Sequence, residues 1–228
     1  MGDIFVHIER HRVAAPRRRT FVAAAVKRAR ALRAAGCLRC DVVQDMDEAG
    51  TYLLCKVYEN RNSYRRLRRA MHAAIPTPEL SLFATNCYPA DRAMQPVAHK
   101  PADKPDRYGR YLHFGIWQIQ PRHREAFLRG MLLDARDSVR LEKGCYRFDM
   151  LQDTRRRNCF YLYQIYESAQ WHDVDHVAMP HVKRLLGRPD WPAWPMRRPE
   201  FPMGRITDTG RSFLVRGRVV WSSELDWG

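Results

Sequence analysis

The chain has 228 residues, 45% of them apolar, and carries 40 Lys and Arg against 25 Asp and Glu, a formal net charge of +15. This length holds one ordinary domain or two small ones, and the apolar content excludes a disordered chain. No apolar run approaches the roughly 18 residues of a membrane span, and the N-terminus lacks the apolar core of a secretory signal, so we expect a cytoplasmic protein.

The first part of the chain predicts the element order β-α-β-β-α-β, which is that of a ferredoxin-like unit. The expected strands are at 3–11, 37–45, 52–59 and 80–87, and the expected helices at 17–34 and 62–73. The helix at 17–34 carries seven Lys and Arg and no acid. Its outer face is either solvated or a dock for nucleic acid, a phosphorylated substrate or an acidic carrier protein.

The second part repeats this order. The expected strands are at 110–119, 145–152, 159–166 and 212–221, and the expected helices at 122–140 and 169–186, the latter broken at Pro180. Residues 36–45 and 144–153 are identical at six of ten positions with an offset of 108, and the strands that follow keep this offset. We therefore interpret the chain as a duplication.

The predicted boundary lies between residues 106 and 107. The first unit, 1–106, ends in a Pro-rich linker; the second, 107–228, includes a Pro-rich and Trp-rich segment at 188–202 and a closing strand. Because a pure linker rarely carries two Trp, we expect Trp191 and Trp194 to cover a pocket mouth.

Six cysteines include one C-x-x-C pair, Cys37 and Cys40, which a strand would point to opposite faces. A second such pair is absent, which argues against zinc, and we expect six reduced thiols. His172 and His176 are four apart, a metal-ligand spacing. Asp173 and Asp175 are nearby, but no third ligand stands out, so no metal is expected.

Three motifs of the second unit resemble the antibiotic biosynthesis monooxygenase family of the dimeric α+β barrel superfamily. They are the Gly-Cys strand start at 144–145, the aromatic-Glu strand end at 166–167 and the His-x4-His pair at 176 and 181. The first unit keeps the first two motifs, but Arg68 and Ala73 replace the histidines. The family usually builds its barrel from two chains. The resemblance thus implies an α+β fold in which two ferredoxin-like units pack as a pseudo-dimeric barrel within one chain, which could pair again as a homodimer.

The resemblance also implies a cofactor-independent monooxygenase of secondary metabolism. It would oxidise an electron-rich polycyclic anthrone or phenol with molecular oxygen, after a base has deprotonated the substrate. The candidate catalytic residues are His113, His176 and His181 as bases and Arg147 as oxyanion partner. The candidate substrate-binding residues are Trp117, Tyr163, Tyr166, Trp191, Trp194, His7 and Tyr58.

Two features of these candidates leave structural roles open. His113 and Trp117 share one strand face, which we expect to line the barrel interior. Arg147 and Asp149 repeat as Arg39 and Asp41, and each Asp could simply pair with its Arg.

Other functions stay open at this stage. An isomerase, a cyclase or a haem-degrading enzyme could use the same fold, although His113 stands near the place where the haem-degrading relatives have an Asn. A non-enzymatic basic module could bind an acidic carrier or nucleic acid, but the aromatic strand at 159–163 lacks the Gly and basic pattern of RNA-stacking strands, so nucleic acid is not expected. A degenerate regulator is the last alternative, since the first unit has lost its His pair.

Overall fold

The computed structural model describes residues 4–74, 80–90, 110–187 and 214–223 of the chain. The described residues form two compact units. Unit 1 contains 4–74, 80–88 and 216–223, and unit 2 contains 89–90, 110–187 and 214–215. No helix within these ranges is long and apolar enough to cross a membrane.

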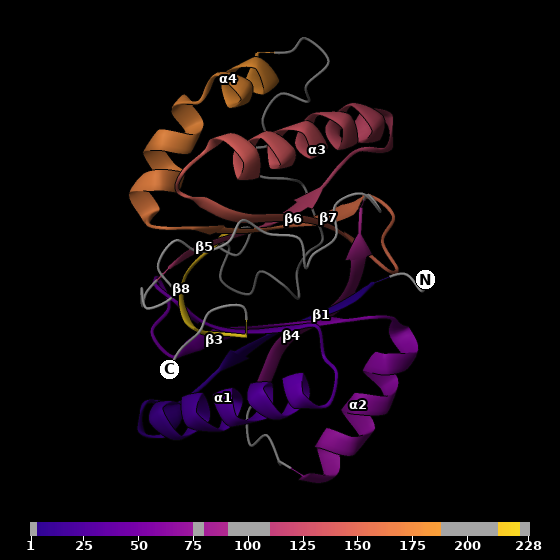
Figure 1. The fold of residues 1–228 in the computed structure, drawn as a ribbon, viewed down its shortest axis with the longest axis vertical. Helices are drawn as coiled ribbons and strands as arrows, with labels where there is room; N and C mark the ends of the chain where they lie inside the picture. The colour runs from indigo at the N-terminus through magenta and orange to yellow at the C-terminus, as the bar shows by residue number, and fades with distance from the viewer. Residues whose placement is uncertain (1–3, 75–79, 91–109, 188–213, 224–228) are drawn as a thin grey trace. The chain divides into compact units, whose positions relative to one another are not determined.

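Unit 1 is an antiparallel sheet with helices on one face. Its elements are β1 (Phe5–Arg12), η1 (Ala15–Arg17), α1 (Arg18–Ala34), β2 (Arg39–Asp45), β3 (Thr51–Tyr58), α2 (Arg61–Ala74), β4 (Leu80–Pro89) and β8 (Leu214–Ser222). The strands pair in the order β8-β2-β3-β1-β4. Helices α1 and α2 cover the same face of this sheet (Figure 1).

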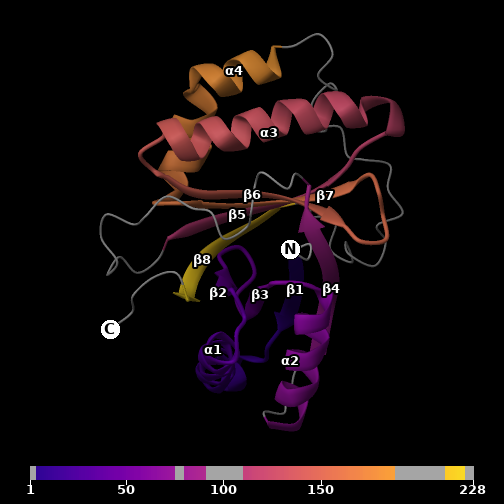
Figure 2. The ribbon, with the colours of Figure 1, turned by 45° about the vertical axis from the view of Figure 1, so that its right-hand side comes forward.

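Unit 2 repeats this plan. Its elements are β5 (Tyr111–Gln118), η2 (Pro121–His123), α3 (Arg124–Leu141), β6 (Cys145–Asp153), β7 (Cys159–Tyr166), η3 (Trp171–His176) and α4 (Pro180–Leu186). Strand β7 lies between β5 and β6, antiparallel to both. Helices α3 and α4 lie on one face of these strands, as both ribbon views show (Figures 1 and 2).

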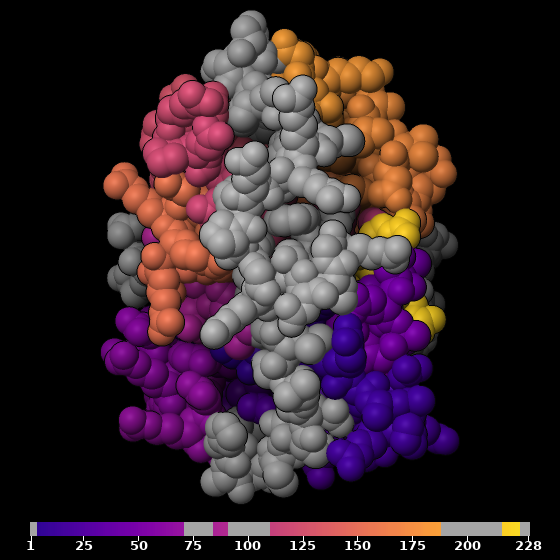
Figure 3. Space-filling model, turned by 180° about the vertical axis from the view of Figure 1, so that it is seen from behind, coloured from indigo at the N-terminus to yellow at the C-terminus, as the bar shows by residue number. Residues whose placement is uncertain are grey.

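The amphipathic pattern of α1 explains how unit 1 closes its core. Phe21, Ala25, Ala29 and Leu32 recur every three or four residues and are buried against the sheet. Of the Lys and Arg at 17–34, Arg18 and Arg28 are half-buried and the other five are exposed: Arg17, Arg19, Lys27, Arg30 and Arg33. The indigo atoms of this part of the chain lie at the surface in Figure 3. The basic outer face predicted for this helix is therefore confirmed.

Strands β6 and β7 are buried on both faces. Every residue of each strand is buried, and in β7 polar and apolar residues do not alternate. Phe148, Met150, Phe160 and Leu162 pack with α3 residues such as Phe127 in one core. The other face of β7 buries Tyr161 and Tyr163.

The α+β class and the two ferredoxin-like units are confirmed. The break predicted at Pro180 separates η3 from α4, because a proline is tolerated only in the first turn of a helix. Strand β8, assigned from the sequence to the second unit, pairs with β2 of unit 1, with Val42 opposite Trp221. The predicted boundary at 106/107 and the segment 188–202 lie outside the described residues. The closure of both units into one barrel stays a prediction.

The predicted orientation of the C-x-x-C pair is wrong. Cys37 precedes β2, so strand alternation does not apply to it, and its Sγ lies 3.5 Å from the Sγ of Cys40. All six cysteines lie within the described residues, where each is a buried thiol outside any disulfide.

Candidate active site

Five of the predicted site residues meet at the helix-covered face of the unit 2 sheet: His113, Trp117, Tyr166, His176 and His181. His113 of β5 stacks on His172 of η3, with ring centroids 3.7 Å apart. Trp117 lies further along β5 and packs near Phe127 of α3, with ring centroids 6.0 Å apart. The prediction that His113 and Trp117 share a face is therefore confirmed. The expectation that they line the barrel interior is wrong, since both contact the helices.

Four histidines of β5, η3 and α4 form a continuous row, which we call the histidine row: His113, His172, His176 and His181. Successive ring centroids are 3.7, 5.6 and 6.2 Å apart. Tyr166 closes one side, with its ring 5.1 Å from His172 and 5.5 Å from His176. The structure thus brings His113, Tyr166, His176 and His181 together, and His172 links them.

On the helix-covered face of β5, the side chains of His113 and Trp117 are half-buried. Tyr111 and Gly115, on the same face, are buried. A Cβ at Gly115 would lie 2.6 Å from Nε1 of Trp117, so the indole lies directly over this glycine. Because Gly115 has no side chain, the flat indole of Trp117 can occupy this place on the face that also carries the His113 imidazole.

Gln164 of β7 lies directly opposite His113 in the β5–β7 pairing. It is buried, and its Oε1 has no hydrogen-bond partner in the part of the chain that the structure describes. A buried amide oxygen without a partner costs about 1–3 kcal/mol, which a ligand that donates a hydrogen bond to it could offset. The Nε2–H groups of the same amide are donors and could bind an oxygen of that ligand.

Asp173 supports the exposed end of the histidine row. Its Oδ1 lies 2.6 Å from Nδ1 of His172. Burial lowers the pKa of His172, and the hydrogen bond to Asp173 only partly opposes this shift. Metal-ligand atoms of His113, His172 and Asp173 all lie within 4.8 Å of one another.

The other end of the row contacts two buried carboxylates, and we call Asp134, Glu142, His176 and His181 the carboxylate cluster. Oε1 of Glu142 lies 2.8 Å from both Nδ1 of His176 and Nε2 of His181. Burial raises the pKa of Glu142, but hydrogen bonds, first from His176, outweigh it, and the pKa ends below its usual value. Burial raises the pKa of Asp134 to about 7.

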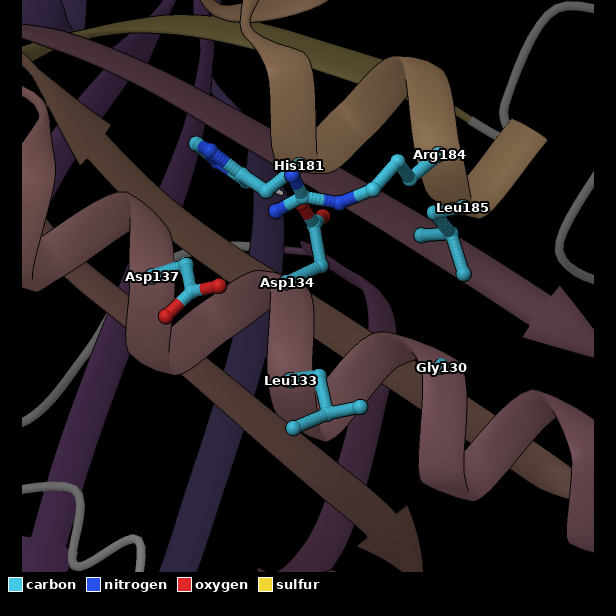
Figure 4. A pocket seen from close by; sticks show the side chains of 7 residues that line it. All are labelled: Gly130, Leu133, Asp134, Asp137, His181, Arg184 and Leu185. Carbon is cyan, nitrogen blue, oxygen red and sulfur yellow. Dashed lines mark ion pairs between the residues drawn. The ribbon is translucent and has the colours of Figure 1, made fainter. Parts of the chain in front are cut away.

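A pocket of about 460 Å³ opens between α3 and α4 beside this cluster. It is lined by Gly130, Leu133, Asp134, Asp137, His181, Arg184 and Leu185. In the close-up, His181 and Arg184 extend from α4 toward Asp134 on α3 (Figure 4). The cluster is therefore reached from outside through His181 and Asp134.

Arg147 and Tyr163 lie on the opposite face of the sheet. Arg147 is buried, and its Nη1 lies 2.9 Å from Oδ1 of Asp149. Tyr163 packs edge-on to Phe114, away from the helices. Strand alternation separates both from the histidine row. The prediction that they share one site with His113 is therefore wrong, whereas the pairing of Arg147 with Asp149 is confirmed.

A family model described as antibiotic biosynthesis monooxygenase matches residues 4–74 and 111–187, once in each unit. These two matches span more than half of the chain. The chain belongs to the antibiotic biosynthesis monooxygenase family. No curated protein matches this family member.

Solved structures similar to this family member share its fold. A candidate monooxygenase from Lactobacillus acidophilus NCFM has a TM-score of 0.65 and 16% identity, covering 81% of this chain and 86% of that chain. A candidate monooxygenase from Fusobacterium nucleatum subsp. nucleatum has a TM-score of 0.65 and 10% identity, with 97% and 94% covered. An anthrone oxidase-like protein has a TM-score of 0.57 and 13% identity, with 96% and 92% covered.

Unit 1 of this family member holds a different polar cluster on its helix-covered face. His7, predicted as a binding residue, lies 2.8 Å from Oδ1 of Asn86 through Nδ1 and 2.8 Å from Oε1 of Glu9 through Nε2. Glu9 also pairs with Lys56. Burial raises the pKa of Glu9, but the charge of Lys56 and the hydrogen bonds of the histidines hold it well below its usual range.

Tyr58, the other binding residue predicted in unit 1, packs edge-on to Tyr64 of α2, with ring centroids 5.3 Å apart. His7 and Tyr58 thus share a face of unit 1, apart from the histidine row of unit 2. Trp191 and Trp194 lie outside the described residues.

Sequence reasoning missed Asp134, Glu142 and Gln164. Asp134 lies on the buried side of α3, and a charged residue there is a signal that helical periodicity could have given. Glu142 lies two residues before the Gly-Cys motif at 144–145, and no local pattern marks it as a buried carboxylate. Gln164 is the polar residue in an otherwise apolar and aromatic stretch at 159–166, but only the strand pairing places it beside His113.

Proposed function

We propose that this family member is a cofactor-independent monooxygenase that oxidises an electron-rich polycyclic anthrone or phenol with molecular oxygen. Family membership supports monooxygenase chemistry in general. The likeness in fold to an anthrone oxidase-like protein supports the substrate class. The single observation that carries the proposal is the grouping of His113, Trp117 and Gln164 on the helix-covered face of unit 2.

Each residue of this grouping has a role in the proposed reaction. The Trp117 indole offers a flat surface on which an aromatic substrate stacks. Neutral His113 accepts the proton of the substrate. A carboxylate oxygen of Asp173 lies within 4.8 Å of a ring nitrogen of His113. This carboxylate therefore stabilises the imidazolium that forms. Gln164 donates a hydrogen bond to the developing oxyanion.

The substrate itself supplies the electrons. The enolate or phenolate formed by proton loss transfers one electron to oxygen, and the two radicals combine to a peroxide. For an anthrone, the peroxide loses water and leaves a quinone, so one oxygen atom enters the product and the other leaves as water. The protein needs to bind, deprotonate and shield the substrate, and we assign no cofactor to these steps.

The basic face of α1 fits an acidic partner. Arg19, Lys27 and Arg30 are exposed on one helix that has no acidic residue in its first turn. We therefore also propose that the enzyme is cytoplasmic and receives its substrate from an acidic carrier protein, which the charge of this basic face attracts.

The first prediction concerns His113. With 1,8-dihydroxyanthrone as probe, the chelator-treated full chain is expected to consume oxygen and form the quinone faster than the uncatalysed reaction. His113→Gln should lower kcat about 100-fold, because it removes the proton acceptor. Gln164→Leu should lower kcat by a similar factor of about 100, because the oxyanion loses its donor. An oxygen electrode and quinone absorbance measure both.

The matched control is His123→Gln. His123 belongs to η2, outside the histidine row, so its variant should keep the wild-type rate. If His113→Gln stays folded and also keeps the wild-type rate, His113 is not the base and the proposal fails.

A further inference from the structure

We propose that Asp134, Glu142, His176 and His181, the carboxylate cluster of unit 2, bind one divalent transition-metal ion such as Zn²⁺. Two imidazoles and two carboxylates are a common donor set for such ions. Ligand atoms of Asp134, His176 and His181 all lie within 4.8 Å of one another. Oε1 of Glu142 lies 2.8 Å from a ring nitrogen of each histidine.

The donors come from separate elements that packing holds in place. Asp134 belongs to α3, Glu142 follows the end of α3, His176 ends η3, and His181 lies in the first turn of α4. All four are buried, and Glu142 is 0% exposed. Oγ of Ser138 lies 3.4 Å from Nε2 of His181 and donates a hydrogen bond to the backbone oxygen of Asp134. Such surrounding contacts orient metal ligands in proteins.

The hydrogen bonding of the cluster leaves room for a cation. Oδ1 of Asp134 is buried and has no hydrogen-bond partner within the described ranges; it lies 3.7 Å from Nε2 of His181. A buried polar atom in this state points to a missing ligand.

The cluster also has a path to solvent. Asp134 and His181 line the pocket between α3 and α4, and their side chains approach each other at its inner end (Figure 4). An ion there can therefore exchange with solvent through this pocket.

This inference goes beyond the proposed oxidation. None of the four ligands is His113, Trp117 or Gln164, and metal binding is measured without an aromatic substrate. Loss of metal binding would therefore leave the oxygenase proposal standing, and the reverse also holds.

The test is titration of the chelator-treated full chain with ZnCl₂ by calorimetry. We expect one ion per chain and an increase in Tm of about 5–10 °C at a hundredfold excess over Kd. Asp134→Asn and His181→Gln should each weaken binding at least tenfold. Asp134→Asn keeps the size of the side chain, so it tests the site even if His181→Gln does not fold.

Two controls separate this site from other ligands. His123→Gln, outside the cluster, should bind Zn²⁺ like the wild type. Co²⁺ should give visible bands without a thiolate charge-transfer band, which excludes Cys37 and Cys40. The inference is overturned if no ion binds, if folded Asp134→Asn keeps wild-type affinity, or if the thiolate band appears.

Discussion

At the scale of single residues, one buried ion pair recurs in both units. Nε of Arg39 lies 3.1 Å from Oδ2 of Asp41, and Nη1 of Arg147 lies 2.9 Å from Oδ1 of Asp149. In each pair, Arg and Asp are two residues apart on one strand and therefore share a face. The repetition in both units, and the burial of all four side chains, indicate a structural role for Arg147.

The prediction at this scale is that Asp149→Asn lowers the free energy of unfolding by about 3 kcal/mol, because it leaves the buried Arg147 charge uncompensated. Urea unfolding of the variant measures this loss. Asp137→Asn is the matched control, since its partner Arg140 is 72% exposed; it should cost less than about 0.5 kcal/mol. Equal costs for the two variants would contradict the structural role.

At the scale of elements, the start of β6 fits closely against η3. A Cβ on Gly144 would lie 2.2 Å from Cδ2 of Trp171, the first residue of η3. The backbone amide of Glu167 also donates a hydrogen bond to the carbonyl of Gly144. The Gly-Cys motif of unit 2 is thus explained by the close approach of an indole ring to the backbone.

The prediction at this scale is that Gly144→Ala destabilises the protein by about 2 kcal/mol through overpacking against Trp171. Thermal or urea unfolding measures the change. In the double variant with Trp171→Ala the clash is gone, so the two costs should not add. Additive costs would show that the ring is not the cause.

At the scale of the whole molecule, the C-terminal strand completes a sheet that begins near the N-terminus. Strand β8 pairs with β2, and Ser222 Oγ donates a hydrogen bond to Oδ1 of Asp41 across a separation of 181 residues. The backbone amide of Ser223 also bonds to the carbonyl of Cys40. The described core of unit 1 is therefore formed by segments from both ends of the chain.

The prediction at this scale concerns a chain truncated after residue 213. Without β8, the amides of β2 that face it lose their partners, so hydrogen exchange in residues 39–45 should become more than tenfold faster. Mass spectrometry of peptides measures this change. Peptides of β6 and β7 in unit 2 serve as the internal reference. Unchanged exchange in β2 would contradict the pairing.

The sequence by itself determined the duplication and the element order. Both follow from local pattern: the identities at offset 108, the helical spacing of residues such as Phe21 and Ala25, and the break at Pro180. Local periodicity reports which residues share a face of an element. It therefore gave His113 and Trp117 a common face correctly.

Only the tertiary structure decided what that face contacts. Strand β7 is buried on both sides and is mostly apolar or aromatic on both, so hydropathy could not distinguish its helix-covered face from the other. The grouping of Gln164 with His113 depends on strand pairing, and the grouping of Glu142 with His176 and His181 depends on helix packing over 34 and 39 residues. Contacts between residues so far apart arise when buried surfaces pack together, and no local pattern of the sequence carries that information.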